Sequence, residues 1–149
     1  MLIIRRFEEK DAEQASDLII RALIEVNSKD YSEAVIRNLC ELFSSQNLIE
    51  MSKKHDILVA IEDNQVVGTV RLKENAIYTV FVDPNYHHQG IGTELMQAIE
   101  NLVKKRQFKE VKLGASITAI EFYKKLGYLD TRETYDDEYG LTYIMKKRL

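Results

Sequence analysis

The sequence predicts an α/β fold of the mixed α+β kind, with about seven strands and about four helices in three layers. Short runs of β-branched and aromatic residues alternate with longer segments whose apolar residues recur at helical spacing. In the middle of the chain, one strand leads through a glycine-rich turn into a helix. The chain has 149 residues, 45% of them hydrophobic, so it can bury a substantial core. We therefore expect a single domain over residues 1–149.

The first half of the chain contains two helical segments between strands. Helical spacing is clearest over residues 11–26, where Leu18, Ile19 and Leu23 share one face. The polar residues that follow break this pattern. The expected elements are a strand at residues 2–7, helices at 11–26 and 31–43, a loop or partial helix at 44–54, and strands at 57–61 and 66–72.

The second half begins with a short apolar run, residues 77–82, which is typical of a strand buried on both faces. Pro84 lacks an N–H group, so it ends strand pairing just beyond this run. A long helix is expected from Thr93, because the apolar residues after it keep helical spacing. The remaining elements are a strand at residues 111–113, a short helix within 118–126, and a hairpin over 128–149.

The glycine turn at Gly90 and Gly92 indicates an anion site. A helix N-terminus presents free backbone N–H groups and partial positive charge, and glycine lets a phosphate approach closely. The P-loop pattern is excluded because no lysine follows Gly92. The dinucleotide fingerprint is excluded because Leu95 occupies its third glycine position.

A second segment, residues 113–128, indicates a strand followed by a short helix and a sharp stop. Thr118 and Glu121 have the spacing of a capping box. Phe122 and Tyr123 share a face with further apolar residues of the helix, and Gly127 suits the left-handed position that ends a helix.

Both segments resemble motifs of the GCN5-related N-acetyltransferase (GNAT) superfamily. Val82-x-Pro84 followed by residues 87–92 is similar to its acetyl-CoA motif, with His87 at a position that usually holds Gln or Arg. Residues 116–128 are similar to a second family segment, with Ser116 in place of Asn. The order of the expected elements also matches this fold. The resemblance therefore covers nearly the whole chain and implies a mixed, mostly antiparallel, twisted sheet.

The resemblance implies an N-acetyltransferase that takes acetyl-CoA as co-substrate, needs no metal, and modifies a primary amine of a small molecule or peptide. In this family a bulge splays the central strand from its neighbour, and the pantetheine arm of CoA lies in the gap. Backbone amides from His88 to Thr93 are then expected to meet the pyrophosphate. The implied cofactor-binding residues are Phe81, Val82, His87, His88, Gln89, Gly90, Ile91, Gly92, Thr93, Ser116 and Tyr123.

Tyr123 occupies the family's position for the catalytic acid. Its hydroxyl either protonates the departing thiolate or only packs and positions the sulfur. An ordinary tyrosine pKa of about 10 is close to the thiol value of about 8.5, so proton transfer would be nearly matched. A general base is not evident, because residues 75–82 contain no acid and Glu74 falls in a turn. Tyr78 either packs or points into the acceptor cleft.

Composition and charge narrow the functional classes to which the protein could belong. A net charge of −3 without a basic run argues against nucleic-acid binding, and no apolar run is long enough to span a membrane. The lone Cys40 and the absence of a signal-peptide pattern fit the cytoplasm. His87 and His88 are adjacent and lack partner ligands, which disfavours a metal site. We expect a monomer or homodimer.

Some alternatives stay open at this point. The acidic run at residues 136–138 is either a solvated hairpin tip or an attraction for a cationic acceptor. The chain could also be a regulatory module that binds CoA or acyl-CoA without turnover, or a nucleotide-binding protein of another fold.

Overall fold

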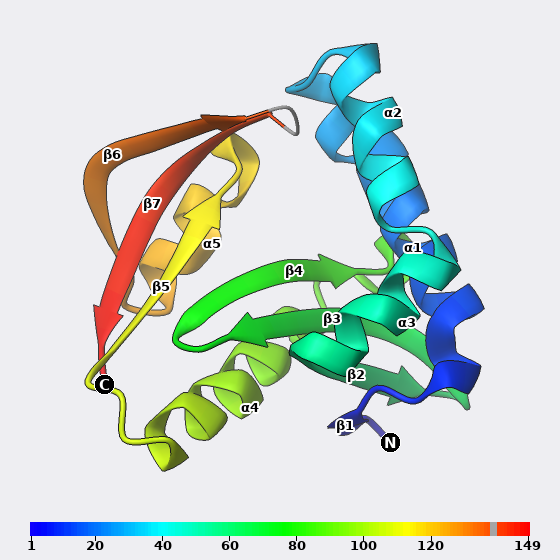
Figure 1. The fold of residues 1–149 in the computed structure, drawn as a ribbon, viewed down its shortest axis with the longest axis horizontal. Helices are drawn as coiled ribbons and strands as arrows, with labels where there is room; N and C mark the ends of the chain where they lie inside the picture. Colours follow the sequence, from blue (N-terminus) through cyan, green and yellow to red (C-terminus); the bar gives the residue numbers. More distant parts are fainter. Residues whose placement is uncertain (138–139) are drawn as a thin grey trace.

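The computed structural model describes residues 1–137 and 140–149, with side chains described at all of these positions except 136 and 137. This part of the chain forms a seven-stranded sheet in the order β1-β2-β3-β4-β5-β7-β6 (Figure 1). The strands are β1 Ile3–Arg6, β2 Asp56–Glu62, β3 Gln65–Lys73, β4 Ala76–Val82, β5 Glu110–Ala115, β6 Leu129–Asp137 and β7 Gly140–Arg148. Neighbouring strands are antiparallel except β4 and β5, which are parallel, so the predicted mixed sheet is confirmed.

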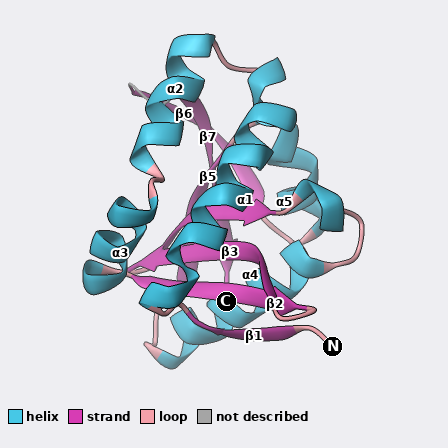
Figure 2. Cartoon of the chain, turned by 90° about the vertical axis from the view of Figure 1, so that its right-hand side faces the viewer, coloured by secondary structure: helices cyan, strands magenta, loops and turns pink. Residues whose placement is uncertain are grey.

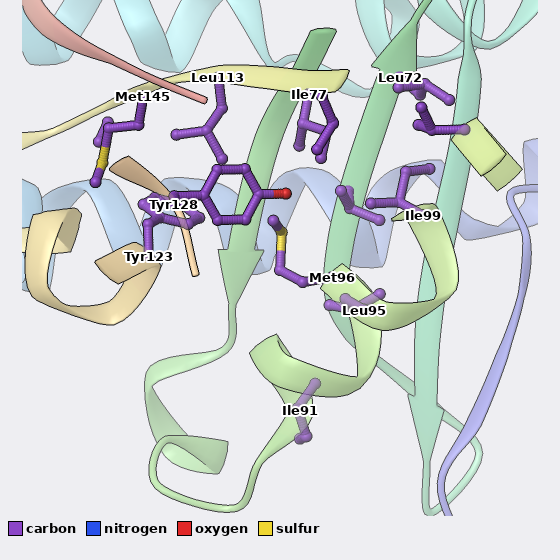
Figure 3. Packing of buried hydrophobic residues seen from close by; sticks show 14 of the residues in the cluster. Leu72, Ile77, Ile91, Leu95, Met96, Ile99, Leu113, Tyr123, Tyr128 and Met145 are labelled. Atoms are coloured by element: carbon purple, nitrogen blue, oxygen red, sulfur yellow. The ribbon is translucent and has the colours of Figure 1, made fainter. Parts of the chain in front are cut away.

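Helices cover both faces of the sheet, which gives the three predicted layers. The α-helices are α1 Ala12–Glu25, α2 Glu33–Leu42, α3 Ser45–Lys54, α4 Ile91–Lys105 and α5 Ile120–Lys125. Short 3-10 turns lie at Glu9–Asp11, Asn27–Lys29, Pro84–Tyr86 and Ile117–Ala119. The larger core cluster packs α4 and α5 against one face (Figure 3), and a second cluster packs α1 and α3 against the other.

The helix α4 lies close to β3 because Gly68 has no side chain. A Cβ atom at Gly68 would lie 2.8 Å from Leu95 Cδ1 and 3.2 Å from Ile91 Cγ2. A side chain at this position would force Leu95 and Ile91 to shift away from the sheet. The apolar stripe of α4, with Leu95, Met96 and Ile99, therefore seats directly on the sheet (Figure 3).

The strands β4 and β5 pair only at their first residues and then separate, as Figure 1 shows. The paired residues are Ala76 with Lys112 and Ile77 with Leu113. Beyond them β4 carries a bulge against β3, at which Thr79 takes a left-handed backbone with φ of 56°. Thr69 Oγ1 donates to the Thr79 carbonyl at 2.9 Å, and Arg71 Nε donates to Thr79 Oγ1 at 3.0 Å. Side chains of β3 thus fix the bulge that the family resemblance predicted.

The far end of the β6–β7 hairpin reaches the start of α2, as Figures 1 and 2 both show. Tyr31 Oη donates to the Leu141 carbonyl at 3.2 Å. A Cβ atom at Gly140 would lie 2.8 Å from the Tyr31 ring, so this glycine permits the contact. Residues far apart in the sequence therefore join the start of β7 to the segment just before α2.

Of the two alternatives for residues 44–54, a loop or a partial helix, the structure shows the helix: Ser44 caps α3 by accepting from the Asn47 N–H at 3.2 Å, and Leu48 is buried, so the described residues hold five α-helices. Two local expectations were wrong. Thr118 does not cap a helix, because a 3-10 turn over Ile117–Ala119 precedes α5. The strand β4 is not buried on both faces, since Tyr78 is 43% exposed.

Other expectations hold. Gly127 ends α5 with a left-handed φ of 98°, and β6 and β7 form the predicted antiparallel hairpin. Within the described ranges, no helix combines the length and apolar character needed to cross a bilayer.

Candidate active site

The turn after β4 is anchored to α1 through Asp83. This carboxylate accepts two hydrogen bonds from the Arg21 guanidinium, at 2.6 and 2.8 Å, and one from the Asn85 N–H at 2.9 Å. The Arg21 hydrogen bond holds the pKa of Asp83 below its usual range despite burial. The end of β4 is therefore fixed relative to α1. Sequence reasoning missed this pair, because Arg21 and Asp83 are distant in the chain.

His87 closes the same turn from the other side. Its Nε2 lies 3.1 Å from the Val82 carbonyl oxygen, and since a carbonyl only accepts, the ring donates through Nε2. The His87 side chain thus stabilises the turn through this hydrogen bond. The next residue, His88, takes a left-handed φ of 65°, which turns the chain toward Gly90.

The first turn of α4 presents free donors. Gly90 occupies the N-cap with φ of 79°, and no side chain caps the helix. The N–H groups of Ile91, Gly92 and Thr93 consequently have no acceptor among the described residues, and they carry the positive end of the helix dipole. A Cβ atom at Gly90 would meet nothing within 4 Å, so open space lies beside this turn.

A cavity of about 680 Å³ lies in front of these donors. The predicted cofactor-binding residues that line it are Phe81, Val82, His87, His88, Gly90, Ile91, Gly92, Thr93, Ser116 and Tyr123. Gln89 is not part of the lining. The end of α1 adds Ala22 and Val26, which sequence reasoning did not find because only the folded chain brings α1 beside β4, and Asn27 follows them in the lining.

Tyr123 and Tyr128 are neighbours with opposite hydrogen bonding. Their rings pack edge to face with centroids 5.9 Å apart (Figure 3). The Tyr128 hydroxyl donates to buried Glu100 Oε2 at 2.7 Å, and Lys147 Nζ donates to Glu100 Oε1 at 2.9 Å. No hydrogen bond of the Tyr123 hydroxyl is found among the described residues, and the side chain lines the cavity. It is therefore available to a ligand.

Burial raises the pKa of Tyr123 well above its ordinary value of about 10. The same effect, followed by the hydrogen bond to Glu100, raises the pKa of Tyr128. Tyr123 thus stays protonated at any ordinary pH and can donate a hydrogen bond. Its pKa is further from that of a thiol than the sequence indicated, so full proton transfer is less well matched.

A second cleft, of about 690 Å³, lies along the first part of β4 and continues over β5, β7 and β6. Tyr78 lines this cleft. Its ring packs on the Arg71 guanidinium, whose carbon lies 4.8 Å from the ring centroid. The carboxylates in the lining come from Glu110 and Glu133, which are not on β4.

The predicted role of the acidic run stays a prediction. Glu138 lies outside the described residues, as do the side chains of Asp136 and Asp137. Over the described ranges, no group of three or more His, Cys, Asp or Glu side chains is arranged to hold a metal ion.

Comparison with known proteins agrees with this geometry. A family model described as "Acetyltransferase (GNAT) domain" matches residues 27–149. The uncharacterized N-acetyltransferase YafP of Escherichia coli (strain K12) is 29% identical over 130 residues, which cover 87% of this chain and 83% of that protein. Matches to two further curated relatives span only 45% and 36% of their lengths.

Solved structures share the fold over the whole chain. A GCN5-related N-acetyltransferase from Rhodopseudomonas palustris superposes with a TM-score of 0.89 at 24% identity, covering 99% of this chain and 95% of that one. The PaiA N-acetyltransferase of Thermoplasma acidophilum, solved in complex with coenzyme A, gives 0.82 at 23% identity, covering 100% and 99%. Because the family match spans most of the sequence and the fold agrees throughout, the chain belongs to the GNAT acetyltransferase family.

Proposed function

We propose that this protein transfers an acetyl group from acetyl-CoA to a primary amine of a small molecule or peptide, by direct attack in a ternary complex. The observation that carries the proposal is the position of the two cavities along β4. One is lined by residues up to Thr79 and the other from Val80 onward, so they meet at the bulge. A thioester delivered from one cavity would meet an amine delivered from the other.

The chain supplies suitable groups for the CoA side. The free N–H groups of Ile91, Gly92 and Thr93 suit the pyrophosphate, because donors at a helix N-terminus bind anions. Beyond Ile77 the β5-facing edge of β4 has no strand partner, so its backbone groups are available to the amides of pantetheine. The Thermoplasma relative, solved with coenzyme A, supports this choice of ligand.

The chemical step needs little from the protein beyond positioning. The neutral amine nitrogen attacks the thioester carbonyl carbon, the carbon–sulfur bond breaks, and the thiolate leaves with the bonding electrons. The protonated Tyr123 hydroxyl donates a hydrogen bond to that sulfur, while backbone N–H groups near the β4 bulge polarise the carbonyl. The acetylated amine then releases its proton to solvent.

The decisive experiment is acetyl-CoA turnover with a panel of amines, followed by free-thiol release and by mass of the product. We expect a mass increase of one acetyl group on at least one amine. Tight binding of CoA without turnover of any amine would favour the regulatory-module alternative. Displacement of bound CoA by ATP or NAD at similar concentrations would argue against a site built for CoA.

A further inference from the structure

Two lysines face each other on the open side of the sheet. Lys112 on β5 and Lys146 on β7 are directly paired in register, and both line the second cleft. The neighbours of Lys112 along β5, Val111 and Leu113, are buried in the core with α4 and α5, so Lys112 points to the other face. Like charges at directly opposed positions destabilise a sheet. The pair therefore needs an explanation other than stability.

Neither lysine is neutralised by the protein. Among the described residues, no carboxylate oxygen lies within 4.0 Å of the ammonium of Lys112 or Lys146. The nearest cleft carboxylate along β5 is Glu110, two residues from Lys112 and opposite Arg148 in register. Since no described ion pair joins a carboxylate to either lysine, both ammonium groups are available to a ligand.

A third cation lies beneath the β4 side of the cleft. The Arg71 guanidinium bonds to Thr79 Oγ1 and to His55 Nδ1, at 3.0 and 2.9 Å, and stacks on Tyr78. It has no carboxylate partner among the described ion pairs, and burial lowers its pKa without removing its charge at neutral pH. The wall where an acceptor would meet β4 is therefore flanked by positive charge from two sides.

The remaining cleft carboxylate is far from that wall. Glu133 lies on β6, and the order β4-β5-β7-β6 places it three strands from β4, or about 14 Å at the usual strand spacing. Lys112 lies on the strand next to β4, level with Ala76. An acceptor positioned at Tyr78 therefore has cations as its nearest charged neighbours.

We propose that the acceptor is a primary amine that also carries an anionic group, and that Lys112 and Lys146 hold this group. The proposal rests on the proposed acetyltransferase function and specifies its substrate class. Lys112 lies two residues along the sheet and one strand across from Tyr78, about 8 Å between backbone positions, and its long side chain can shorten this span to that of an amine and an acidic group separated by a few carbon atoms.

The same charges account for the absence of an acid on β4. Positive groups near a bound ammonium lower its pKa, which favours the neutral nucleophile. The ammonium can then lose its proton to water without a dedicated carboxylate. An acceptor whose far end is cationic gains nothing from this arrangement and is repelled by it.

The test compares three acceptors of one length whose far ends differ in charge: 4-aminobutyrate, butylamine and 1,4-diaminobutane. We expect kcat/KM for 4-aminobutyrate to exceed that for the other two by at least about tenfold at low salt, and the preference to shrink as salt is added. Replacing both lysines, with Lys112→Gln and Lys146→Gln, should remove most of the preference, because kcat/KM should fall by a larger factor for 4-aminobutyrate than for butylamine.

The matched control is Lys105→Gln, which removes one positive charge at an exposed position of α4. It should keep the wild-type preference. The double variant should fold at least as well as the wild type, since it removes like-charge repulsion. Equal or better turnover of 1,4-diaminobutane by the wild type, or an unchanged preference in the double variant, would overturn the substrate class alone. Absence of turnover with every amine of the larger panel would overturn the acetyltransferase function itself.

Discussion

Replacing Tyr123 with Phe tests whether the Tyr123 hydroxyl contributes to the reaction rate or to the stability of the protein. No hydrogen bond of the Tyr123 hydroxyl is found among the described residues, so the substitution removes none and keeps the ring that packs on Tyr128. We expect the melting temperature to change by less than about 2 °C. The rate should fall by roughly ten- to a thousandfold in kcat, because the sulfur loses its hydrogen-bond donor. The Kd for acetyl-CoA should change only a few-fold.

The matched control is Tyr128→Phe, which removes a hydroxyl from the neighbouring ring. This hydroxyl donates to a buried carboxylate at 2.7 Å, and loss of such a bond costs about 1.5–3 kcal/mol of unfolding free energy. The melting temperature should therefore fall by about 3–12 °C. Because the Tyr128 hydroxyl is bonded to Glu100 and does not line the cavity, kcat should stay within about twofold of the wild type.

The assays are thermal unfolding and steady-state release of free thiol at saturating acetyl-CoA. Burial raises the pKa of Tyr123, so the loss in kcat should be uniform between about pH 6 and pH 9, without a change in the basic limb. Wild-type kcat in a stable Tyr123→Phe protein would refute the assigned role. A rate loss in Tyr128→Phe as large as that in Tyr123→Phe would show that the aromatic packing, and not the hydroxyl, controls the reaction.

Three further outcomes follow from the turn and its anchor. Gly92→Asp should weaken acetyl-CoA binding at least about tenfold in calorimetric titration. The substitution adds negative charge beside the free donors, and its Cβ would lie 3.1 Å from the Phe122 ring. Unchanged affinity in a folded variant would count against the site. Gly90→Ala should lower the unfolding free energy measured in urea by about 1–2 kcal/mol, because a residue with a side chain is strained in the left-handed backbone of Gly90. No steric clash adds to this cost, since the space beside Gly90 is open. An unchanged unfolding free energy would show that the turn rearranges. Arg21 lowers the pKa of Asp83, so the ion pair stabilises the folded protein fully above the ordinary carboxyl pKa of about 3.9, and this stabilisation is lost as pH falls through the lower folded pKa. The difference in unfolding free energy between the wild type and Arg21→Met should therefore shrink from pH 5 toward pH 2. A constant difference would contradict this linkage.

The sequence by itself determined the elements and the anion-binding turn. Helical spacing and alternating apolar runs are local properties, so most helices and strands were predicted to within a few residues. The turn from His87 to Thr93 is also local, because consecutive residues supply its glycines, its donors and the helix dipole. The sequence left residues 44–54 open between a loop and a partial helix, because the helix depends on Leu48 packing against α1 as well as on its serine cap, and that packing requires the rest of the fold.

The tertiary structure alone decided the second cleft and the state of the tyrosines. The pairing of β5 with β7, two strands that are not consecutive along the chain, places Lys112 beside Lys146, and the pairing of β3 with β4 places Arg71 against Tyr78. Which of Tyr123 and Tyr128 has a free hydroxyl depends on Glu100 of α4 lying beside one ring and not the other. Charge and hydrogen bonding act through space over a few ångströms, so residues that are tens of positions apart in the sequence set them, and no local pattern records them.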